Sequence, residues 1–355
     1  MKRFVVFFIL LIFPILSFAQ IEYIDAAKLT LVGKVFENTP NPYHRLDTQT
    51  YPGLNEAEQR QAMQSSGIAV AFRTDSPRIH VKAEFAKLGG GGSTGPNAQQ
   101  GFDLYIKKDG SWRWAGTAHF SKDGEKALIY YNDCGMCDCL VYLPLFSSVN
   151  LLQIGIRPGD RIESIKNPFR HRIAVFGSSF TQGYGCSRSA MSYTAQLSRF
   201  TGIQFINFGF SGRSMLQKYF AEALADAQVD AYIFDAFSNP SAEIIEERLF
   251  AFIETIQAAN PGKPLIFIKT LYREWRSFNS DVDRKETAKM EMADYMMKTA
   301  MKKYKDVYYV TSTNATDENH DTTVDGTHPG DYGYKLMAQS IKEPILKILA
   351  KYGIK

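Results

Sequence analysis

The chain has 355 residues, of which 45% are hydrophobic and 22% are charged, and this balance is ordinary for a globular protein. It excludes a disordered or a fibrous chain. The formal net charge is +4 at pH 7 and no cluster of lysine and arginine stands out, so the sequence does not indicate a nucleic-acid partner. At roughly 150 residues per domain, the length predicts two domains.

The first nineteen residues have the pattern of a secretory signal peptide. A basic pair at positions 2 and 3 precedes an apolar run, Phe4–Leu16, and Ser17-Phe18-Ala19 then places small residues at the two positions that a signal peptidase reads. We therefore predict cleavage before Gln20 and an exported protein, periplasmic or extracellular. A membrane anchor is the alternative, but the run is shorter than the ~20 apolar residues of a spanning helix, and Pro14 interrupts it. We expect no stable membrane insertion.

Residues from about 21 to 165 have the pattern of a β-rich domain. Short runs of strand-forming residues alternate with turn signals such as Asp109-Gly110 and Pro158-Gly159, and Gly89–Gly92 is predicted to be a loop tip. The expected architecture is a β-sandwich domain over residues 20–168. The predicted strands are Gly67–Phe72, Arg78–Phe85, Phe102–Ile106, Lys126–Tyr131, Leu140–Leu143 and Leu151–Ile156.

Three of the four cysteines are crowded together: Cys134, Cys137 and Cys139. In an exported protein this crowding favours a disulfide within the cluster. Free thiols and a metal site are the alternatives, although no second pair of Cys or His lies nearby to complete four zinc ligands. Cys186 stands alone and is expected to be a small buried hydrophobic residue.

From about residue 171 the pattern changes to strands that alternate with helices. Nearly continuous apolar strands joined by helices predict a parallel sheet covered on both faces, and hence a three-layer α/β domain over residues 169–355. Active sites of such sheets lie at the carboxyl ends of the strands. The predicted strands are Arg172–Phe176, Gln204–Phe208, Ala231–Phe237, Pro264–Thr270 and Val307–Thr311, and the predicted helices include Ser241–Ala259, Asp283–Tyr304 and Tyr332–Lys351.

Polar residues and glycines follow these elements in four blocks, each of which by itself is consistent with a turn or a helix cap. The blocks are Gly177–Gly183, Asn207–Ser214, Ser238–Pro240 and Asp325–Pro329. Ser179, on a tight turn before a helix, can expose its hydroxyl. A hydrolase serine needs a base that takes its proton and an acid that orients this base. His328 and Asp325, three residues apart in one late loop, can supply both.

With these blocks, residues from about 171 to 350 resemble the SGNH (GDSL-like) hydrolases. Such enzymes carry a Gly-Asp-Ser-like block, a block with an oxyanion glycine, a block with an oxyanion asparagine and a closing Asp-x-x-His. The resemblance implies a flavodoxin-like α/β fold and a serine esterase whose oxyanion hole includes the N–H of the nucleophile. The matching positions are Ser179 for the nucleophile, Gly212 for the oxyanion glycine, Asn239 for the oxyanion asparagine, Asp325 for the acid and His328 for the base.

Two positions depart from the family pattern. Ser178 replaces the usual aspartate before the nucleophile, and the third block, normally Gly-x-Asn-Asp, is Phe237-Ser238-Asn239-Pro240. The Asn-Pro-Ser form resembles a bacterial subgroup of the family. The rival α/β-hydrolase elbow, Gly-x-Ser-x-Gly, requires a second glycine where this chain has Thr181.

The front half resembles the GxDLY domain that precedes SGNH domains in this subgroup. Gly101-Phe102-Asp103-Leu104-Tyr105 matches its motif, and Leu140–Phe146 is similar to another of its strands. We expect Asp103 and Tyr105 mainly to hold the β-sandwich together, with a functional role as the alternative.

We therefore expect a secreted serine esterase that hydrolyses short-chain acyl esters, acetyl above all, on small-molecule or glycan substrates through an acyl-enzyme. No metal or organic cofactor is expected. The chain offers no long apolar lid, and the loops that can reach Ser179 carry aromatic side chains and hydrogen-bond donors that suit a sugar ring or simply pack the loops. They are Tyr184, Arg188, Arg213, Ser214, Tyr272, Arg273 and Trp275. The alternatives are a lipase or thioesterase for longer acyl groups and a catalytically silent glycan-binding protein.

Overall fold

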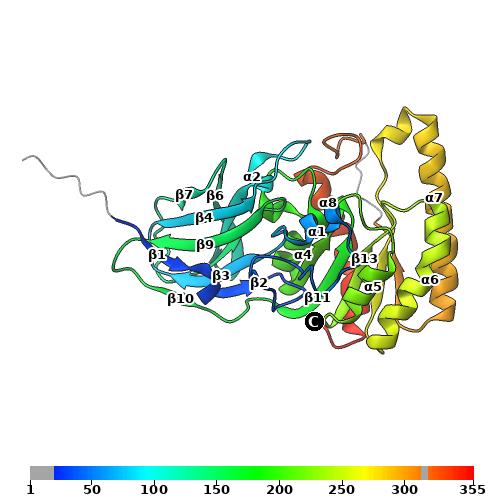
Figure 1. The fold of residues 1–355 in the computed structure, drawn as a ribbon, viewed down its shortest axis with the longest axis horizontal. Coiled ribbons are helices and arrows are strands. Elements are labelled where there is room, and N and C mark those ends of the chain that lie inside the picture. Colours follow the sequence, from blue (N-terminus) through cyan, green and yellow to red (C-terminus); the bar gives the residue numbers. More distant parts are fainter. Residues whose placement is uncertain (1–19, 313–318) are drawn as a thin grey trace, which may run out of the picture.

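The computed structural model describes residues 20–312 and 319–355, and the predicted signal peptide, residues 1–19, lies outside them. A β-rich half is followed by an α/β half, and the two halves lie against each other along the long axis of the molecule (Figure 1). Both predicted fold classes are confirmed. In the described part of the chain, no helix combines the length and the apolar character that crossing a membrane requires.

Two antiparallel sheets face each other in the N-terminal half. One has the order β1-β9-β4-β7 and the other the order β10-β3-β8-β5-β6, with β2 paired to β3. Inward-facing side chains such as Phe72, Phe102 and Ile154 fill the space between the sheets and are fully buried. The elements of this half are β1 (Glu22–Asp25), the short 3₁₀ turn η1 (Ala26–Lys28), β2 (Thr30–Val32), α1 (Glu56–Ala62), β3 (Ala69–Thr74), β4 (Ile79–Lys87), α2 (Pro96–Gln99), β5 (Gly101–Lys108), β6 (Ser111–His119), β7 (Gly124–Ile129), β8 (Cys137–Tyr142), β9 (Ser148–Ile156) and β10 (Ile162–Ser164).

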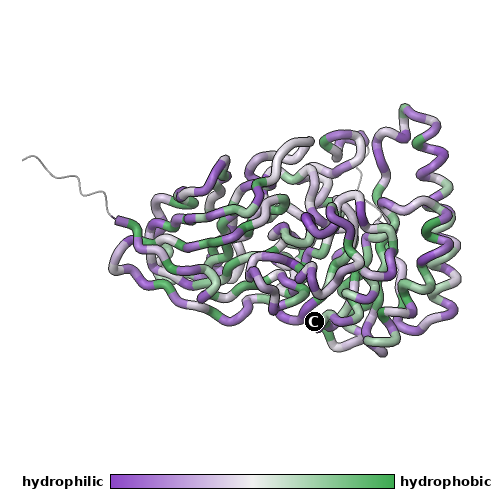
Figure 2. The backbone as a smooth tube through the Cα atoms, viewed as in Figure 1, coloured by the Kyte–Doolittle hydropathy of each residue, from purple (hydrophilic) through white to green (hydrophobic). Residues whose placement is uncertain are grey.

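Parallel strands form the sheet of the C-terminal half in the flavodoxin-like order β12-β11-β13-β14-β15. Helices α5, α6 and α7 cover one face of the sheet, and α4 and α8 cover the other. Hydrophobic and hydrophilic stretches alternate along α7, as in a helix that covers a sheet with one side (Figure 2). The elements are β11 (Arg170–Gly177), α3 (Ser179–Gln182), η2 (Ser189–Met191), α4 (Tyr193–Thr201), β12 (Ile203–Gly209), α5 (Lys218–Ala225), β13 (Ala231–Asp235), α6 (Ala242–Ala259), β14 (Leu265–Ile268), η3 (Glu274–Ser277), α7 (Ser280–Lys303), β15 (Val307–Val310) and α8 (Asp331–Ala350).

Residues 33–66 contain helix α1 and no strand, and they pack on the α/β half. Val35 and Leu46 share its hydrophobic core with residues of α5 and α6. Arg45 is almost completely buried and donates a hydrogen bond to the carbonyl oxygen of Gly209, at the end of β12, over 2.7 Å. This segment therefore reaches the carboxyl edge of the parallel sheet. The domain boundary predicted between residues 168 and 169 stays a prediction.

The predicted strands and the three predicted helices occur close to their expected positions. Strand β6 is not predicted, because its sequence, Ser-Trp-Arg-Trp-Ala-Gly-Thr-Ala-His, lacks a clear apolar alternation, and it forms an edge of its sheet with most side chains at least partly exposed. Helix α1 is not predicted either, since only two of its residues are buried.

The disulfide expected in the cysteine cluster joins Cys134 to Cys137. Cys139 and Cys186 are buried free thiols. Burial raises the pKa of both thiols, so they stay protonated and behave as small hydrophobic side chains.

Candidate active site

The side chains of Ser179, His328 and Asp325 form one hydrogen-bonded chain at the carboxyl edge of the parallel sheet. The Ser179 hydroxyl oxygen lies 2.9 Å from Nε2 of His328, and Nδ1 of His328 lies 2.9 Å from Oδ2 of Asp325. Ser179 begins α3 directly after β11, whereas Asp325 and His328 lie in the loop before α8. The fold thus brings together the three residues that the sequence separates by almost half the chain.

The turn before α3 distinguishes its two serines. The Ser178 hydroxyl accepts a hydrogen bond from the N–H of Phe180 over 3.1 Å and so caps the short helix. Ser178 is fully buried, whereas Ser179 is 7% exposed and faces His328. The residue that replaces the usual aspartate is therefore a helix cap, and Ser179 is the serine that can meet a substrate.

Backbone N–H groups hold the Asp325 carboxylate. The N–H groups of His328 and Thr327 donate to Oδ1 over 2.8 Å and 3.1 Å. Burial by itself raises the pKa of Asp325, but these hydrogen bonds and the His328 ring outweigh burial, so the pKa lies below its usual value. The carboxylate is ionised at neutral pH and accepts from Nδ1–H. Nε2 is then free to accept the proton of Ser179.

The three predicted oxyanion donors come from neighbouring strand ends. Ser179 follows β11, Gly212 follows β12 and Asn239 follows β13, and β11 lies between the other two strands. Gly212 has φ +68°, and an added Cβ would meet no atom within 4 Å, so the left-handed backbone is what requires glycine here. Oδ1 of Asn239 accepts from the N–H of Ser214 over 3.3 Å, which fixes the amide. Within residues 20–312 and 319–355, the backbone N–H groups of Ser179 and Gly212 and the side-chain NH₂ of Asn239 donate to no other protein group.

A buried carboxylate that sequence reasoning missed connects two of these strand ends. Asp235, at the end of β13, is 1% exposed and accepts hydrogen bonds from the hydroxyls of Ser178, Thr181 and Ser238 over 2.9–3.0 Å. Burial raises the pKa of Asp235, and these hydrogen bonds oppose the increase. Its only signal in the sequence is one acidic residue inside an apolar run. Asp235 ties the turn of the nucleophile to the turn of Asn239.

Two cations also hold the asparagine turn. The carbonyl oxygen of Ser238 accepts from Nη2 of Arg273 over 2.5 Å and from Nζ of Lys289 over 3.1 Å, and Glu286 pairs with both cations. Burial lowers the pKa of Lys289 to about 8, the Arg273 cation adds to this effect, and Glu286 opposes it. The peptide bond directly before Asn239 is therefore held by two charged donors.

Gln182 of α3 holds the glycine turn together with two glutamines of the N-terminal half, Gln61 and Gln64. Gln182, on α3, accepts at Oε1 from the N–H and the hydroxyl of Ser211, over 3.0 Å and 2.7 Å. Its Nε2 donates to Oε1 of Gln64 over 2.6 Å, and Nε2 of Gln61 donates to the Ser211 carbonyl over 3.0 Å. Ser211, directly before Gly212, is thus positioned by α3 and α1, and Gln64, just after α1, holds the side chain of α3 in place.

The aspartate and tyrosine of the Gly-x-Asp-Leu-Tyr motif connect the two halves of the molecule. Asp103 is fully buried and accepts from Nη1 of Arg188 over 2.6 Å and from the N–H of Ala190 over 3.1 Å, both in the α/β half. It also accepts from Trp114 of the sandwich over 2.8 Å, and Arg188 donates to the Tyr105 hydroxyl over 2.9 Å. The expectation that this motif holds the sandwich together is therefore incomplete.

Two of the residues expected to face a sugar lie beside the triad. The ring of Tyr184 lies 4.3 Å from that of His328, centroid to centroid. Trp275 is 56% exposed, and its backbone N–H donates to the loop that carries the triad acid and base. Arg188 and Arg273 are instead bound in the internal contacts described above.

Comparison with known proteins shows likeness over nearly the whole chain. Residues 170–347 match the model of the GDSL-like lipase/acylhydrolase family, and residues 21–162 match the N-terminal domain of SGNH-hydrolase-type esterases. A GDSL-like lipase from Bacteroides ovatus is 36% identical, with a TM-score of 0.89 over 93% of this chain and 98% of that chain. The salicylyl-acyltransferase SsfX3 from a tetracycline biosynthetic pathway is 19% identical, with a TM-score of 0.72 over 92% of this chain and 97% of that chain. A family two carbohydrate esterase from Cellvibrio japonicus is 14% identical, with a TM-score of 0.57 over 80% and 90%. No curated protein matches.

Proposed function

Because the chain belongs to the GDSL-like lipase/acylhydrolase family, whose members are carboxylic ester hydrolases, we propose that it is a secreted serine esterase that removes short acyl groups, acetyl above all, from carbohydrates. The observation that carries the proposal is the aligned chain of Ser179, His328 and Asp325, with 2.9 Å at each of its two contacts. A catalytically silent glycan-binding protein has no use for this alignment.

The proposed reaction is acyl transfer in two steps. Nε2 of His328 takes the proton of Ser179 while the hydroxyl oxygen attacks the ester carbonyl, and the imidazolium then gives this proton to the departing alcohol oxygen. Water, deprotonated by the same nitrogen, attacks the acyl-enzyme. The carboxylic acid leaves, and Ser179 regains its proton. Asp325 stabilises the imidazolium in both steps.

The negative charge that develops on the carbonyl oxygen needs donors that are already oriented. We assign this role to the N–H groups of Ser179 and Gly212 and to the side-chain amide of Asn239. Their oriented turns support the assignment, since an oxyanion hole acts through donors fixed before the reaction. Removing one such donor typically lowers kcat by about 10²–10³.

A carbohydrate substrate is supported by the lining of the cavity beside Tyr184. Polar side chains such as Gln64 and Gln99 line it together with apolar ones such as Leu88 and Phe146. Such a mixed lining suits a saccharide, whose hydroxyls pair with polar groups while its CH groups pack on aromatic and aliphatic side chains. The shared two-part fold with a carbohydrate esterase from Cellvibrio japonicus points in the same direction.

Export is proposed from the pattern of residues 1–19, which has the basic start, the apolar run and the small residues of a signal peptide. The disulfide between Cys134 and Cys137 fits an oxidising compartment.

The test compares Ser179→Ala with Ser178→Ala on p-nitrophenyl acetate. Loss of the nucleophile should lower kcat by at least about 10³, with an unchanged circular dichroism spectrum. Ser178→Ala should be milder, because it removes a helix cap worth about 1 kcal/mol of stability. Wild-type turnover by folded Ser179→Ala protein would end the assignment of the nucleophile.

A further inference from the structure

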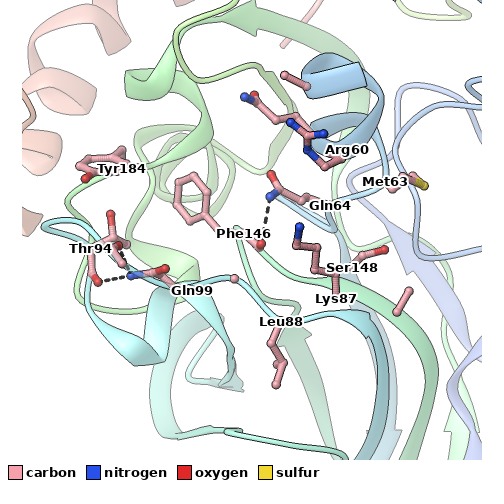
Figure 3. Close-up of a pocket in the computed structure, with 16 residues that line it drawn as sticks. Arg60, Met63, Gln64, Lys87, Leu88, Thr94, Gln99, Phe146, Ser148 and Tyr184 are labelled. Atoms are coloured by element: carbon pink, nitrogen blue, oxygen red, sulfur yellow. Dashed lines mark hydrogen bonds between the residues drawn. The ribbon is translucent and has the colours of Figure 1, made fainter. Parts of the chain in front are cut away.

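A cavity of about 590 Å³ lies between the β half and the α/β half. Its walls are helix α1, the end of strand β4, the glycine-rich loop after it, and Tyr184 from the α/β half (Figure 3). Phe146 lies in the middle of this lining, with the rings of Phe146 and Tyr184 at 6.0 Å in an edge-to-face arrangement. All of its lining residues except Tyr184 belong to the β half.

The cavity adjoins the active site, because three of its lining side chains hold catalytic elements. The ring of Tyr184 packs on that of His328 at 4.3 Å. Gln61 donates to the carbonyl of Ser211, and Gln64 accepts from a side chain of α3, the helix that Ser179 begins. The cavity therefore shares lining residues with the contacts that position the base, the glycine turn and the nucleophile helix.

The glycine-rich loop holds Tyr184 at the cavity wall. Gly92 has φ +70°, and a Cβ at this position would lie 2.0 Å from the Tyr184 hydroxyl oxygen. The N–H of Ser93 donates to this oxygen over 3.0 Å, and Thr94 Oγ1 accepts from the N–H of Gly185 over 2.9 Å. The β half thus fixes the side chain that separates the cavity from the triad.

The charged side chains of the cavity lining are all cationic. They are Arg60 on α1 and Lys87 at the end of β4, and none of the residues that line the cavity is acidic. Figure 3 shows the Lys87 side chain directed toward the wall formed by α1, which carries Arg60. Arg60 pairs with Glu56 at the surface over 2.7 Å, whereas Lys87 has no ion pair within residues 20–312 and 319–355. An unpaired ammonium group at the mouth of a cavity attracts an anionic group.

We propose that this cavity binds the saccharide part of the ester and that the saccharide is anionic, with a carboxylate or sulfate group that contacts Lys87 and Arg60. This inference rests on the proposed function for the identity of the reacting ester. It also explains why the β half is part of the enzyme: α1, β4 and the glycine-rich loop supply the substrate contacts that the α/β half lacks. The gain is modest, since both cations are exposed to water and exposed ion pairs contribute little.

The experiment compares acetate release from three substrates. They are acetylated oligogalacturonides, the same oligosaccharides with their carboxyl groups methylated, and an acetylated sulfated oligosaccharide. We expect wild-type kcat/KM to be about three- to tenfold higher for the free carboxylates than for the methylated form, mainly through KM, and to lose this preference at 0.5 M salt. A matching advantage for the sulfated substrate would identify sulfate as an equally good ligand, and its absence would restrict the site to carboxylates.

Variants assign the effect to the cavity. Lys87→Gln should reduce the preference for the charged substrate to about twofold or less, and Lys87→Glu should reverse it. Lys108→Gln is the matched control, since Lys108 is an exposed lysine at the turn between β5 and β6, outside the cavity lining. Equal KM values for the charged and methylated substrates in the wild type, or equal effects of the two glutamine variants, would overturn the proposal.

Binding keeps this test separate from that of the proposed function. Calorimetry with Ser179→Ala protein and deacetylated oligogalacturonides measures the cavity without catalysis. Binding that Lys87→Glu abolishes, together with a lack of esterase activity in the wild-type protein, would refute the proposed function and support the anionic site. Turnover of p-nitrophenyl acetate without any preference for the charged substrate would support the proposed function and refute the anionic site.

Discussion

The contact between Asp103 and Arg188 should be a main source of stability at the junction between the two halves. Asp103 is fully buried and the Arg188 side chain is 20% exposed, with 2.6 Å between Oδ2 and Nη1. We consider the substitution Asp103→Asn, which removes the charge and keeps one oxygen, enough for the indole N–H of Trp114 at the Oδ1 position. The guanidinium of Arg188 would then be left without a counter-ion.

Removing one partner of a buried ion pair costs about 3–5 kcal/mol, because the other charge stays desolvated. Since one fifth of the Arg188 side chain reaches water and the Tyr105 hydroxyl remains an acceptor, we expect the lower end, about 3 kcal/mol. This is a large part of the ~5–15 kcal/mol that typically stabilises a folded protein. Urea unfolding followed by circular dichroism measures the loss.

Two further variants make the measurement specific. Asp281→Asn breaks an ion pair with Arg284 whose side chains are 72% and 74% exposed, so its expected cost is only about 0–1 kcal/mol. Adding Arg188→Met to Asp103→Asn should recover most of the lost stability, because no unpaired charge remains. Stability of Asp103→Asn within about 1 kcal/mol of the wild type, or no recovery in the double variant, would refute the reasoning.

Three other predictions concern the active site. The lowered pKa of Asp325 means that its carboxylate stabilises the fold above the ordinary carboxyl pKa of about 3.9 and loses this effect as the pH falls through the folded value. The difference in unfolding free energy between the wild type and Asp325→Asn should therefore shrink from pH 6 to pH 2.5, and a constant difference would contradict the assignment. Asp235→Asn should lower kcat for p-nitrophenyl acetate by about 10–100-fold with little change in KM, because it loosens two turns that position reacting groups; an effect on KM alone would speak for a substrate contact. In a series of p-nitrophenyl esters, acetyl should be hydrolysed faster than butyryl and longer chains, and a preference for octanoyl would favour a lipase or thioesterase.

Much of the site can be predicted from the sequence because its residues stand where strands end. Ser179 follows an apolar strand at a turn, and the carboxyl ends of parallel strands meet at one edge of a sheet. The apolar runs that predict the parallel strands therefore suffice to place the nucleophile turn near the turns of Gly212 and Asn239. The closing Asp-x-x-His adds Asp325 and His328 from local spacing alone. The contacts of His328 with Ser179 and Asp325 show that these three side chains meet. Their catalytic roles remain the proposal that the variants test.

Only the tertiary structure decides which polar residues pair over long distances. Asp235 lies inside an apolar run, where periodicity predicts a strand but not a carboxylate shared by three hydroxyls. Asp103 belongs to a motif that the sequence assigns to the sandwich, yet its cation, Arg188, is 85 residues away in the other half. The cavity with Lys87 forms where a helix, a strand end and a loop that are distant in the chain come together beside Tyr184. Local patterns encode which face of an element is buried, whereas a buried charge finds its partner only through the packing of elements that are distant in the chain.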